Sequence, residues 1–320
     1  MNRRHCLGGF VAATGAVGLS SLEGAWAQSA AIPMIAGPDP DTHIVKFKAP
    51  RGSVDTHTHI FGPNARYPYA ANRSYTPPDA PLEMFAALHA KIGIDRAVIV
   101  NATVHGTDNR PVTDAIAVSG GRYKGIANIV DTISDKELEA LDKGGIRGCR
   151  FTFLARLGGM PDMTKFNRIV DKIKGLGWHV DLYLESTMMV DFAPILRQLP
   201  VSYVIDHMGA IKAAQGLDQP AMLALLDLQR DEKCWVKISG PERMSASGPP
   251  FHDAVPFAQM LIAGAPDRVI WGSDWPHPNV KIMPNDGDLV DLIPLYAPDE
   301  KIRHKLLVDN PVRLFGFAAS

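Results

Sequence analysis

Residues 54–63 read VDTHTHIFGP, and this stretch is the clearest indication of the fold. It begins as an apolar strand, predicted over Ser53–Phe61, and carries His57 and His59 toward its end. Residues two apart on a strand point to the same face, so we expect both imidazoles on one side of the chain. A single buried histidine is usually structural, but such a pair at the end of a first strand is more typical of a functional site.

Seven more β-branched runs follow this strand, and longer helical runs separate them. The predicted strands are Ser53–Phe61, Arg96–Ala102, Lys124–Val130, Gly148–Leu154, His179–Glu185, Val201–His207, Trp235–Ser239 and Val269–Asp274. The predicted helices are Pro81–Ile92, Ser134–Lys143, Thr164–Lys174, Met188–Leu199, Gln219–Arg230 and Asp253–Ala263, and Ser134 with Glu137 forms a capping box. Strands that alternate with helices indicate parallel pairing. Eight such units predict an α/β fold, a closed (β/α)8 TIM-type barrel. The alternative, a doubly wound open sheet, would need a glycine-rich loop after the first strand, which the sequence lacks.

Composition excludes several classes of protein. The chain has 320 residues, of which 46% are hydrophobic and 21% charged, as expected for a packed globular enzyme rather than a disordered chain. Lys and Arg number 33 against 34 Asp and Glu, a balance that argues against a nucleic-acid partner. Cys6, Cys149 and Cys234 are too few for a disulfide framework and do not have the spacing of a metal site.

Residues 1–27 have the pattern of a twin-arginine export signal. Arg3 and Arg4 precede a short Gly/Ala-rich apolar stretch, and Ala25-Trp26-Ala27 forms a cleavage site. A membrane anchor is the alternative, but the apolar stretch is too short for a stable span. We therefore predict a periplasmic protein with no stable membrane anchor. Residues 28–50 are expected to form an extended arm, and residues 51–320 the barrel.

Polar residues recur where later strands end, and barrel enzymes carry out their chemistry at the carboxyl ends of the strands. The sixth strand ends in Asp206-His207, which places another imidazole at the barrel mouth, with Asp206 expected to point the opposite way. The eighth strand ends at Asp274, and Pro276 prevents its continuation. A carboxylate at this position could be a metal ligand, a general base, or both.

Four motifs taken together, VDTHTHIFGP, VIDHMG, WVKISGPER and VIWGSDWPHPN, resemble the amidohydrolase superfamily. They are most similar to its lactonase branch, typified by 2-pyrone-4,6-dicarboxylate lactonase and including 4-sulfomuconolactone hydrolases. The resemblance covers residues 50 to 318 and implies a distorted (β/α)8 barrel. It also implies a hydrolase that opens the lactone ring of an acidic metabolite, as in bacterial degradation of aromatic compounds. We expect His57, His59 and His207 to polarise the lactone carbonyl while Asp274 accepts a proton from water.

The metal content is a separate question. Relatives with two metals need a Lys or Glu at strand four and a histidine at strand five, but Gly148–Leu154 has neither Lys nor Glu, and Tyr183 stands near the strand-five position. His179 lies at the opposite end of its strand. We therefore expect metal-independent catalysis, as the resemblance also implies. The alternative is one Zn²⁺ held by His57, His59, His207 and Asp274.

Three arginines are expected to bind substrate anions: Arg150, Arg156 and Arg243. Arg150 lies within an apolar strand and needs an anion, either a protein carboxylate or the substrate. Tyr75 and Tyr183 are added to this set by the resemblance, whereas Arg147 and Arg313 are expected in surface salt bridges. Ala210 stands where the resembling lactonase has another arginine, so the substrate's acid groups are expected to differ.

The sequence is also compatible with three other functions. One is a metal-dependent decarboxylase of an aromatic or muconate-type acid, and another is a sugar-acid lactone hydrolase or isomerase. The third is a noncatalytic periplasmic binding protein for organic acids, which would have no need of Asp274. In each case the expected partner is a small acidic molecule.

Overall fold

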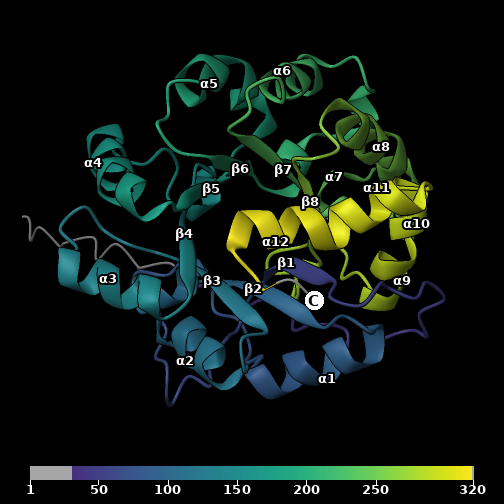
Figure 1. Cartoon of the computed structure of the whole chain (residues 1–320). Helices are drawn as coiled ribbons and strands as arrows, with labels where there is room; N and C mark the ends of the chain where they lie inside the picture. Colours follow the sequence, from purple (N-terminus) through teal and green to yellow (C-terminus); the bar gives the residue numbers. More distant parts are fainter. Residues whose placement is uncertain (1–30, 319–320) are drawn as a thin grey trace, which may run out of the picture. The chain divides into compact units, whose positions relative to one another are not determined.

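Eight parallel strands lie side by side at the centre of the computed structural model, which describes residues 31–318 (Figure 1). They are β1 Val54–Thr58, β2 Arg96–Val100, β3 Tyr123–Ala127, β4 Ile146–Thr152, β5 His179–Tyr183, β6 Tyr203–Ile205, β7 Cys234–Ile238 and β8 Val269–Trp271. Each strand pairs in parallel with the next one along the chain. The predicted (β/α)8 barrel is therefore confirmed.

Helices connect the strands and surround them. The six predicted helical runs correspond to α1 Leu82–Ile92, α3 Asp135–Lys143, α4 Met163–Ile173, α5 Met189–Leu196, α6 Pro220–Leu228 and α8 Val255–Gly264. The structure adds α2 Arg110–Val118, α7 Pro241–Met244, α9 Asp286–Asp291, α10 Ile293–Tyr296, α11 Glu300–His304 and α12 Asn310–Phe315. The predicted capping box begins α3: Ser134 Oγ accepts from the Glu137 N–H, and Glu137 Oε2 accepts from the Ser134 N–H.

The barrel closes where β1 meets β8. Thr56 Oγ1 donates to the Trp271 carbonyl at 2.7 Å, and the Asp274 N–H donates to the His57 carbonyl at 2.8 Å. Gly272 permits this contact, because a Cβ at this position would lie 2.7 Å from the Cβ of His57. Closure therefore brings the segment after β8 directly against the histidines of β1.

The strands end one to three residues earlier than the sequence predicted, and three of the functional residues lie just beyond such ends. His59, His207 and Asp274 follow the ends of β1, β6 and β8 instead of belonging to those strands. The backbone gives the reason for two of them, since His207 and Asp274 have φ angles of 50° and 69°. Such left-handed angles are incompatible with a strand.

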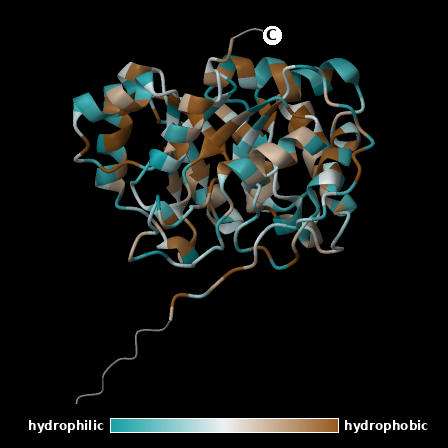
Figure 2. Cartoon of the chain, turned by 90° about the horizontal axis from the view of Figure 1, so that it is seen from below, coloured by the Kyte–Doolittle hydropathy of each residue, from teal (hydrophilic) through white to brown (hydrophobic). Residues whose placement is uncertain are grey.

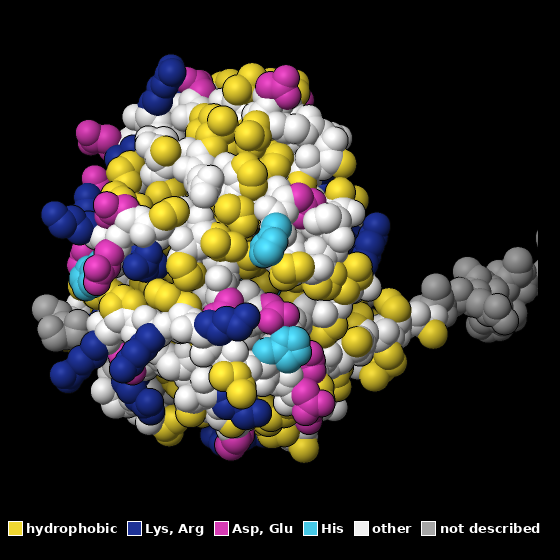
Figure 3. All heavy atoms as spheres, turned by 90° about the vertical axis from the view of Figure 1, so that its right-hand side faces the viewer, with side chains coloured by type: hydrophobic (Ala, Val, Ile, Leu, Met, Phe, Trp, Pro, Cys, Tyr) yellow, Lys and Arg dark blue, Asp and Glu magenta, His cyan; other side chains and the backbone are white. Residues whose placement is uncertain are grey.

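The core lies inside the barrel and between the strands and helices. Figure 2 shows hydrophobic strands at the centre and, around them, helices that contain both hydrophobic and hydrophilic residues. At the amino-terminal end of the barrel, Phe315 of α12 packs with Val54 and Val98 in a buried cluster. On the face seen in Figure 3, positive and negative side chains are interspersed among hydrophobic ones.

The described part of the predicted arm, residues 31–50, contains no helix and only an isolated bridge from Met34 to Thr76. Asn285 Oδ1 accepts from the His43 N–H, and Asp291 Oδ1 accepts from two further N–H groups of the arm. The predicted export signal at residues 1–27 lies outside the described residues. Among the described helices, none has both the length and the apolar character needed to cross a membrane.

Candidate active site

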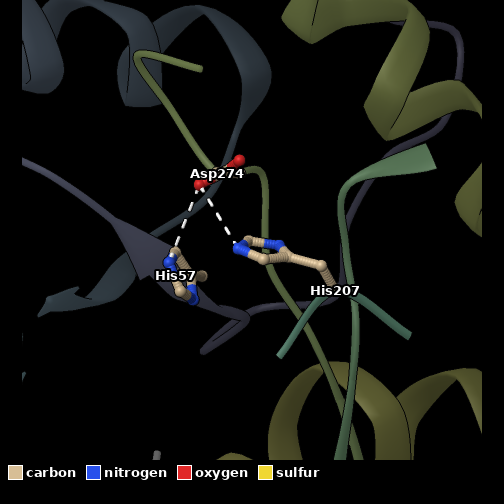
Figure 4. Close-up of side chains that lie close together, drawn as sticks. All are labelled: His57, His207 and Asp274. Carbon is tan, nitrogen blue, oxygen red and sulfur yellow. Dashed lines mark ion pairs between the residues drawn. The ribbon is translucent and has the colours of Figure 1, made fainter. Parts of the chain in front are cut away.

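Asp274 and three histidines converge at the carboxyl end of the barrel. Figure 4 shows Asp274 between His57 and His207. The Oδ1 atom of Asp274 lies 3.6 Å from Nε2 of His57, 3.5 Å from Nε2 of His59 and 3.9 Å from Nε2 of His207. Its other oxygen, Oδ2, accepts from Arg243 through Nε at 2.8 Å and through a terminal nitrogen at 2.5 Å. One carboxylate thus has an arginine on one oxygen and three imidazoles around the other.

All four side chains are buried, and burial affects the charge of the carboxylate and of the imidazoles differently. Burial alone would raise the pKa of Asp274, but Arg243 and the three imidazoles outweigh it and hold that pKa well below the ordinary value. Burial also lowers the pKa of His57, His59 and His207. An ionised carboxylate therefore faces three neutral imidazoles.

Contacts of the Nδ1 atoms orient two of the rings. His59 Nδ1 lies 2.8 Å from the Val100 carbonyl, which can only accept, so this nitrogen carries the proton and Nε2 of the neutral ring has a free lone pair. His207 Nδ1 lies 2.9 Å from Ser239 Oγ, a hydroxyl that can donate or accept. His59 is thus suited to accept a proton, whereas His207 is free to donate one from Nε2.

Most of the predicted site residues line one small pocket. They are His59, Tyr75, Arg150, Arg156, Tyr183, His207, Arg243 and Asp274. His57 is fully buried and does not line this pocket. The Tyr183 ring packs edge-on against His207, with ring centroids 4.6 Å apart, and the guanidinium carbons of Arg150 and Arg156 lie 5.5 and 5.9 Å from its centroid.

The three predicted anion-binding arginines differ in their surroundings. Arg243 is occupied by Asp274, and Arg150 Nε lies 3.5 Å from Oδ2 of Asp206. The anion that Arg150 requires is therefore at least partly supplied by the protein. Arg156 is exposed, so it is the most available of the three to a ligand. Away from the site, Arg147 is half-buried beside Asp142, and Arg313 is bonded to the Asp267 carbonyl.

Sequence reasoning missed a buried lysine beneath the histidines. Lys237 Nζ lies 2.8 Å from Asp181 Oδ2, 2.9 Å from Asp206 Oδ1 and 3.1 Å from His57 Nδ1. The side chains of all four residues are fully buried. Burial opposes the ammonium charge, but the two carboxylates outweigh it and raise the pKa of Lys237. The signal was in the sequence, because Lys237 interrupts an otherwise apolar strand just as Arg150 does.

Asp206 also faces the barrel interior, where it contacts Lys237 and Arg150, as well as lying 3.4 Å from His57 Nδ1. The expectation that it points away from His207 therefore needs a correction: both side chains are buried at the same end of the barrel. The 3-10 turn that follows β6, His207–Ala210, bends the chain sharply enough to allow this.

A second group of cations lies beside Ala210. Ala210, Arg156, Lys212 and Lys281 line a pocket adjacent to the first, and Arg156, Tyr183 and Arg243 border both pockets. Lys212 Nζ donates to the Arg243 carbonyl at 3.0 Å. Positive charge is thus present near the position where the resembling lactonase has an additional arginine.

Among the described residues, His57, His207 and Asp274 offer atoms within 4.8 Å of one another and are candidate metal ligands. His57, Asp181 and Asp206 form a second candidate set, but Lys237 Nζ lies among these three side chains. An ammonium group therefore stands where a second cation would bind.

The comparisons with known proteins agree with this geometry. A family model described as amidohydrolase matches residues 54–317. The chain is 43% identical over 291 residues to 4-sulfomuconolactone hydrolase of Hydrogenophaga intermedia, covering 90% of this chain and 96% of that protein. It is also 43% identical over 280 residues to 2-pyrone-4,6-dicarboxylate hydrolase of Comamonas testosteroni, covering 84% and 92%. A crystal structure of a probable 2-pyrone-4,6-dicarboxylic acid hydrolase from Acinetobacter baumannii, with citric acid bound, matches with a TM-score of 0.74 at 27% identity, covering 83% of this chain and all of that one.

Proposed function

The chain belongs to the amidohydrolase family, and from that premise we propose that it hydrolyses the lactone ring of a small acidic metabolite. One observation carries the proposal: an ionised carboxylate, Asp274 Oδ1, faces three neutral imidazoles at the edge of an arginine-lined pocket. The relatives named as lactone hydrolases, which match most of the chain, support it.

In the proposed reaction, Asp274 accepts a proton from water as the water attacks the lactone carbonyl. The N–H group of His207, which lines the pocket, stabilises the negative charge that develops on the carbonyl oxygen, whereas the N–H group of His57 points toward Oδ1 of Asp274. The contact of His59 with Val100 supports an accepting role for its Nε2, in place of the polarising role that the sequence predicted. Asp274 then returns the proton to the ring oxygen as the ester bond breaks.

The proposal includes catalysis without a metal. A zinc site on His57, His59, His207 and Asp274 needs a lone pair on each nitrogen that binds it. The ammonium of Lys237 faces Nδ1 of His57, so the proton of the neutral ring belongs on Nε2, and that nitrogen has no lone pair for a metal. The donor set therefore does not fit a four-ligand zinc ion. A metal-dependent decarboxylase of an aromatic or muconate-type acid, the alternative, would require this ring to change its protonation.

The substrate is proposed to carry two anionic groups. Arg150 and Arg156 border the first pocket, while Lys212 and Lys281 border the second, so each side offers positive charge. Planar guanidinium groups suit a carboxylate, whereas an ammonium binds any compact anion, including a sulfonate. This arrangement favours a lactone with a carboxylate and a second acid group of either kind.

The experiment that tests this function is a pH-stat screen of lactones on purified protein with zinc measured in the same sample. The panel contains 4-sulfomuconolactone, 2-pyrone-4,6-dicarboxylate, a sugar-acid lactone and a neutral lactone. Acid release from an anionic lactone, retained after chelator treatment and dialysis, is the expected result. Hydrolysis of none of these, or activity that depends on stoichiometric zinc, contradicts the proposal.

We also propose export to the periplasm through the twin-arginine route. The motif at Arg3-Arg4 and the cleavage site at Ala25-Trp26-Ala27 support this, and both lie outside the described residues.

A further inference from the structure

We propose that Lys237 is a positioning residue that fixes His57 in the tautomer with its proton on Nε2, so that this ring presents a donor to the carboxylate of Asp274. The proposed effect on catalysis rests on the proposed function, but the tautomer itself does not.

Three groups surround the Lys237 ammonium, which donates to Asp181 Oδ2 and His57 Nδ1 and forms an ion pair with Asp206 Oδ1. Asp181 Oδ2 and Asp206 Oδ1 lie at 2.8 and 2.9 Å, and His57 Nδ1 completes the set at 3.1 Å. A proton on Nδ1 would point at the ammonium, which has no lone pair to accept it. The neutral ring therefore carries its proton on Nε2.

The ammonium keeps its charge because the barrel interior is electrically balanced. Lys237 and Arg150 contribute two positive charges, and Asp181 and Asp206 contribute two negative ones. The contacts run from Lys237 to both carboxylates and from Arg150 to Asp206. Because all four side chains are almost completely buried, losing any one charge would leave another unpaired at high cost.

The proton on Nε2 lies on the side of the His57 ring that faces Asp274. Nε2 of His57 is 3.6 Å from Asp274 Oδ1 and has no hydrogen-bond partner among the described residues. Asp274 Oδ1 is buried and also without a hydrogen-bond partner, so the N–H of Nε2 and this carboxylate oxygen face each other across 3.6 Å. Lys237 thus acts through His57 without touching the pocket. In many proteins, the hydrogen bond made by one ring nitrogen of a histidine decides which of the two nitrogens carries the proton.

The test measures the tautomer directly by two-dimensional ¹H–¹⁵N NMR of ¹⁵N-histidine-labelled protein. His57→Gln identifies the His57 signals among those of the eleven histidines. The expected pattern in the wild-type protein is that of the Nε2–H tautomer. The Nδ1–H pattern, or a ring protonated on both nitrogens at neutral pH, would overturn the proposal. This measurement needs no substrate, so it stands even if the lactonase activity is not found.

The informative variant is the double substitution Lys237→Met with Asp181→Asn. It removes one charge of each sign, so Arg150 and Asp206 remain as a balanced pair. Asp206 Oδ1, 3.4 Å from His57 Nδ1, then becomes the nearest charged acceptor, and the ring should change to the Nδ1–H tautomer. With Nε2 unprotonated, we expect tighter zinc binding by calorimetry and a kcat lower by roughly 10- to 100-fold, with little change in KM.

The matched control is Lys233→Met with Asp231→Asn, which removes a partly exposed Lys–Asp pair just before the same strand. It should keep the wild-type tautomer and kcat. A double variant at positions 237 and 181 that keeps the Nε2–H tautomer would show that Lys237 does not fix it. If that variant does not fold, as judged by circular dichroism, the wild-type spectrum still decides which nitrogen of His57 carries the proton, and the Nδ1–H pattern there overturns the proposal.

Discussion

Arg243 donates through Nε to Oδ2 of Asp274 at 2.8 Å and leaves Oδ1 of that carboxylate to the histidines. The two oxygens of Asp274 therefore have different surroundings. Oδ2 is paired with the guanidinium, and Oδ1 faces the pocket. Arg243 was predicted to hold a substrate anion, but its first partner is the proposed general base.

Replacing Asp274 by Asn should lower kcat by roughly 10²–10⁴-fold while the substrate still binds, because the amide keeps the shape but cannot accept the proton. Asn also tolerates the left-handed backbone at this position, where φ is 69°, so the fold should persist. Steady-state kinetics and calorimetric binding measure the two effects. Asp171→Asn, at an exposed position of α4, is the control. Near-normal kcat in folded Asp274→Asn protein would mean that another group activates water.

Activity should be lost on acidification only below pH 3.8, the ordinary pKa of an aspartate, because the pKa of Asp274 is lowered. The base is active when ionised, so activity is lost only as the pH falls through this lowered value. Arg243→Met removes the strongest charge that lowers the pKa of Asp274, and should therefore move the loss of activity to higher pH. Profiles of kcat for both proteins provide the check. An unchanged pH of activity loss in Arg243→Met would mean that Asp274 does not control it.

Arg150 and Arg156 should differ when each is changed to Met. Arg156→Met should raise KM with no change in melting temperature, and this effect should weaken at high salt because the side chain is exposed. Arg150→Met should cost about 2–4 kcal/mol in kcat/KM, and should also lower the melting temperature because Asp206 loses a partner. Kinetics at two salt concentrations and thermal melts separate the two cases. An unaltered KM for an acidic lactone in both variants would assign them purely structural roles.

Changing both Arg3 and Arg4 to Lys should leave the protein in the cytoplasm, because the twin-arginine route recognises that pair. In cells with the wild-type sequence, the mature protein should begin near Gln28. Fractionation with amino-terminal sequencing tests both expectations, and changing Arg51 to Lys is the control. Export of the Lys-Lys protein at the normal level would rule out this route.

Much of the site could be predicted from local sequence. Strand periodicity placed His57 and His59 on one side, and the carboxyl-end rule for parallel strands placed His207 and Asp274 at the same mouth. These inferences hold because both rules depend on backbone geometry that every parallel barrel shares. The strand ends were less accurate, because β6 and β8 end before the positive φ angles of His207 and Asp274, which the residue types do not indicate.

The sequence by itself determined the barrel, the order of its strands and which side chains reach the mouth. Only the tertiary structure decided which groups pair across the interior: Arg243 with Asp274, Arg150 with Asp206, and Lys237 with Asp181, Asp206 and His57. These partners lie on different strands or in the segments that follow them, and the stagger of the strands around the closed barrel sets the depth of each side chain. A buried charge in an apolar strand shows that a partner must exist. It does not identify that partner, because local sequence contains no information on which side chains meet at the same depth.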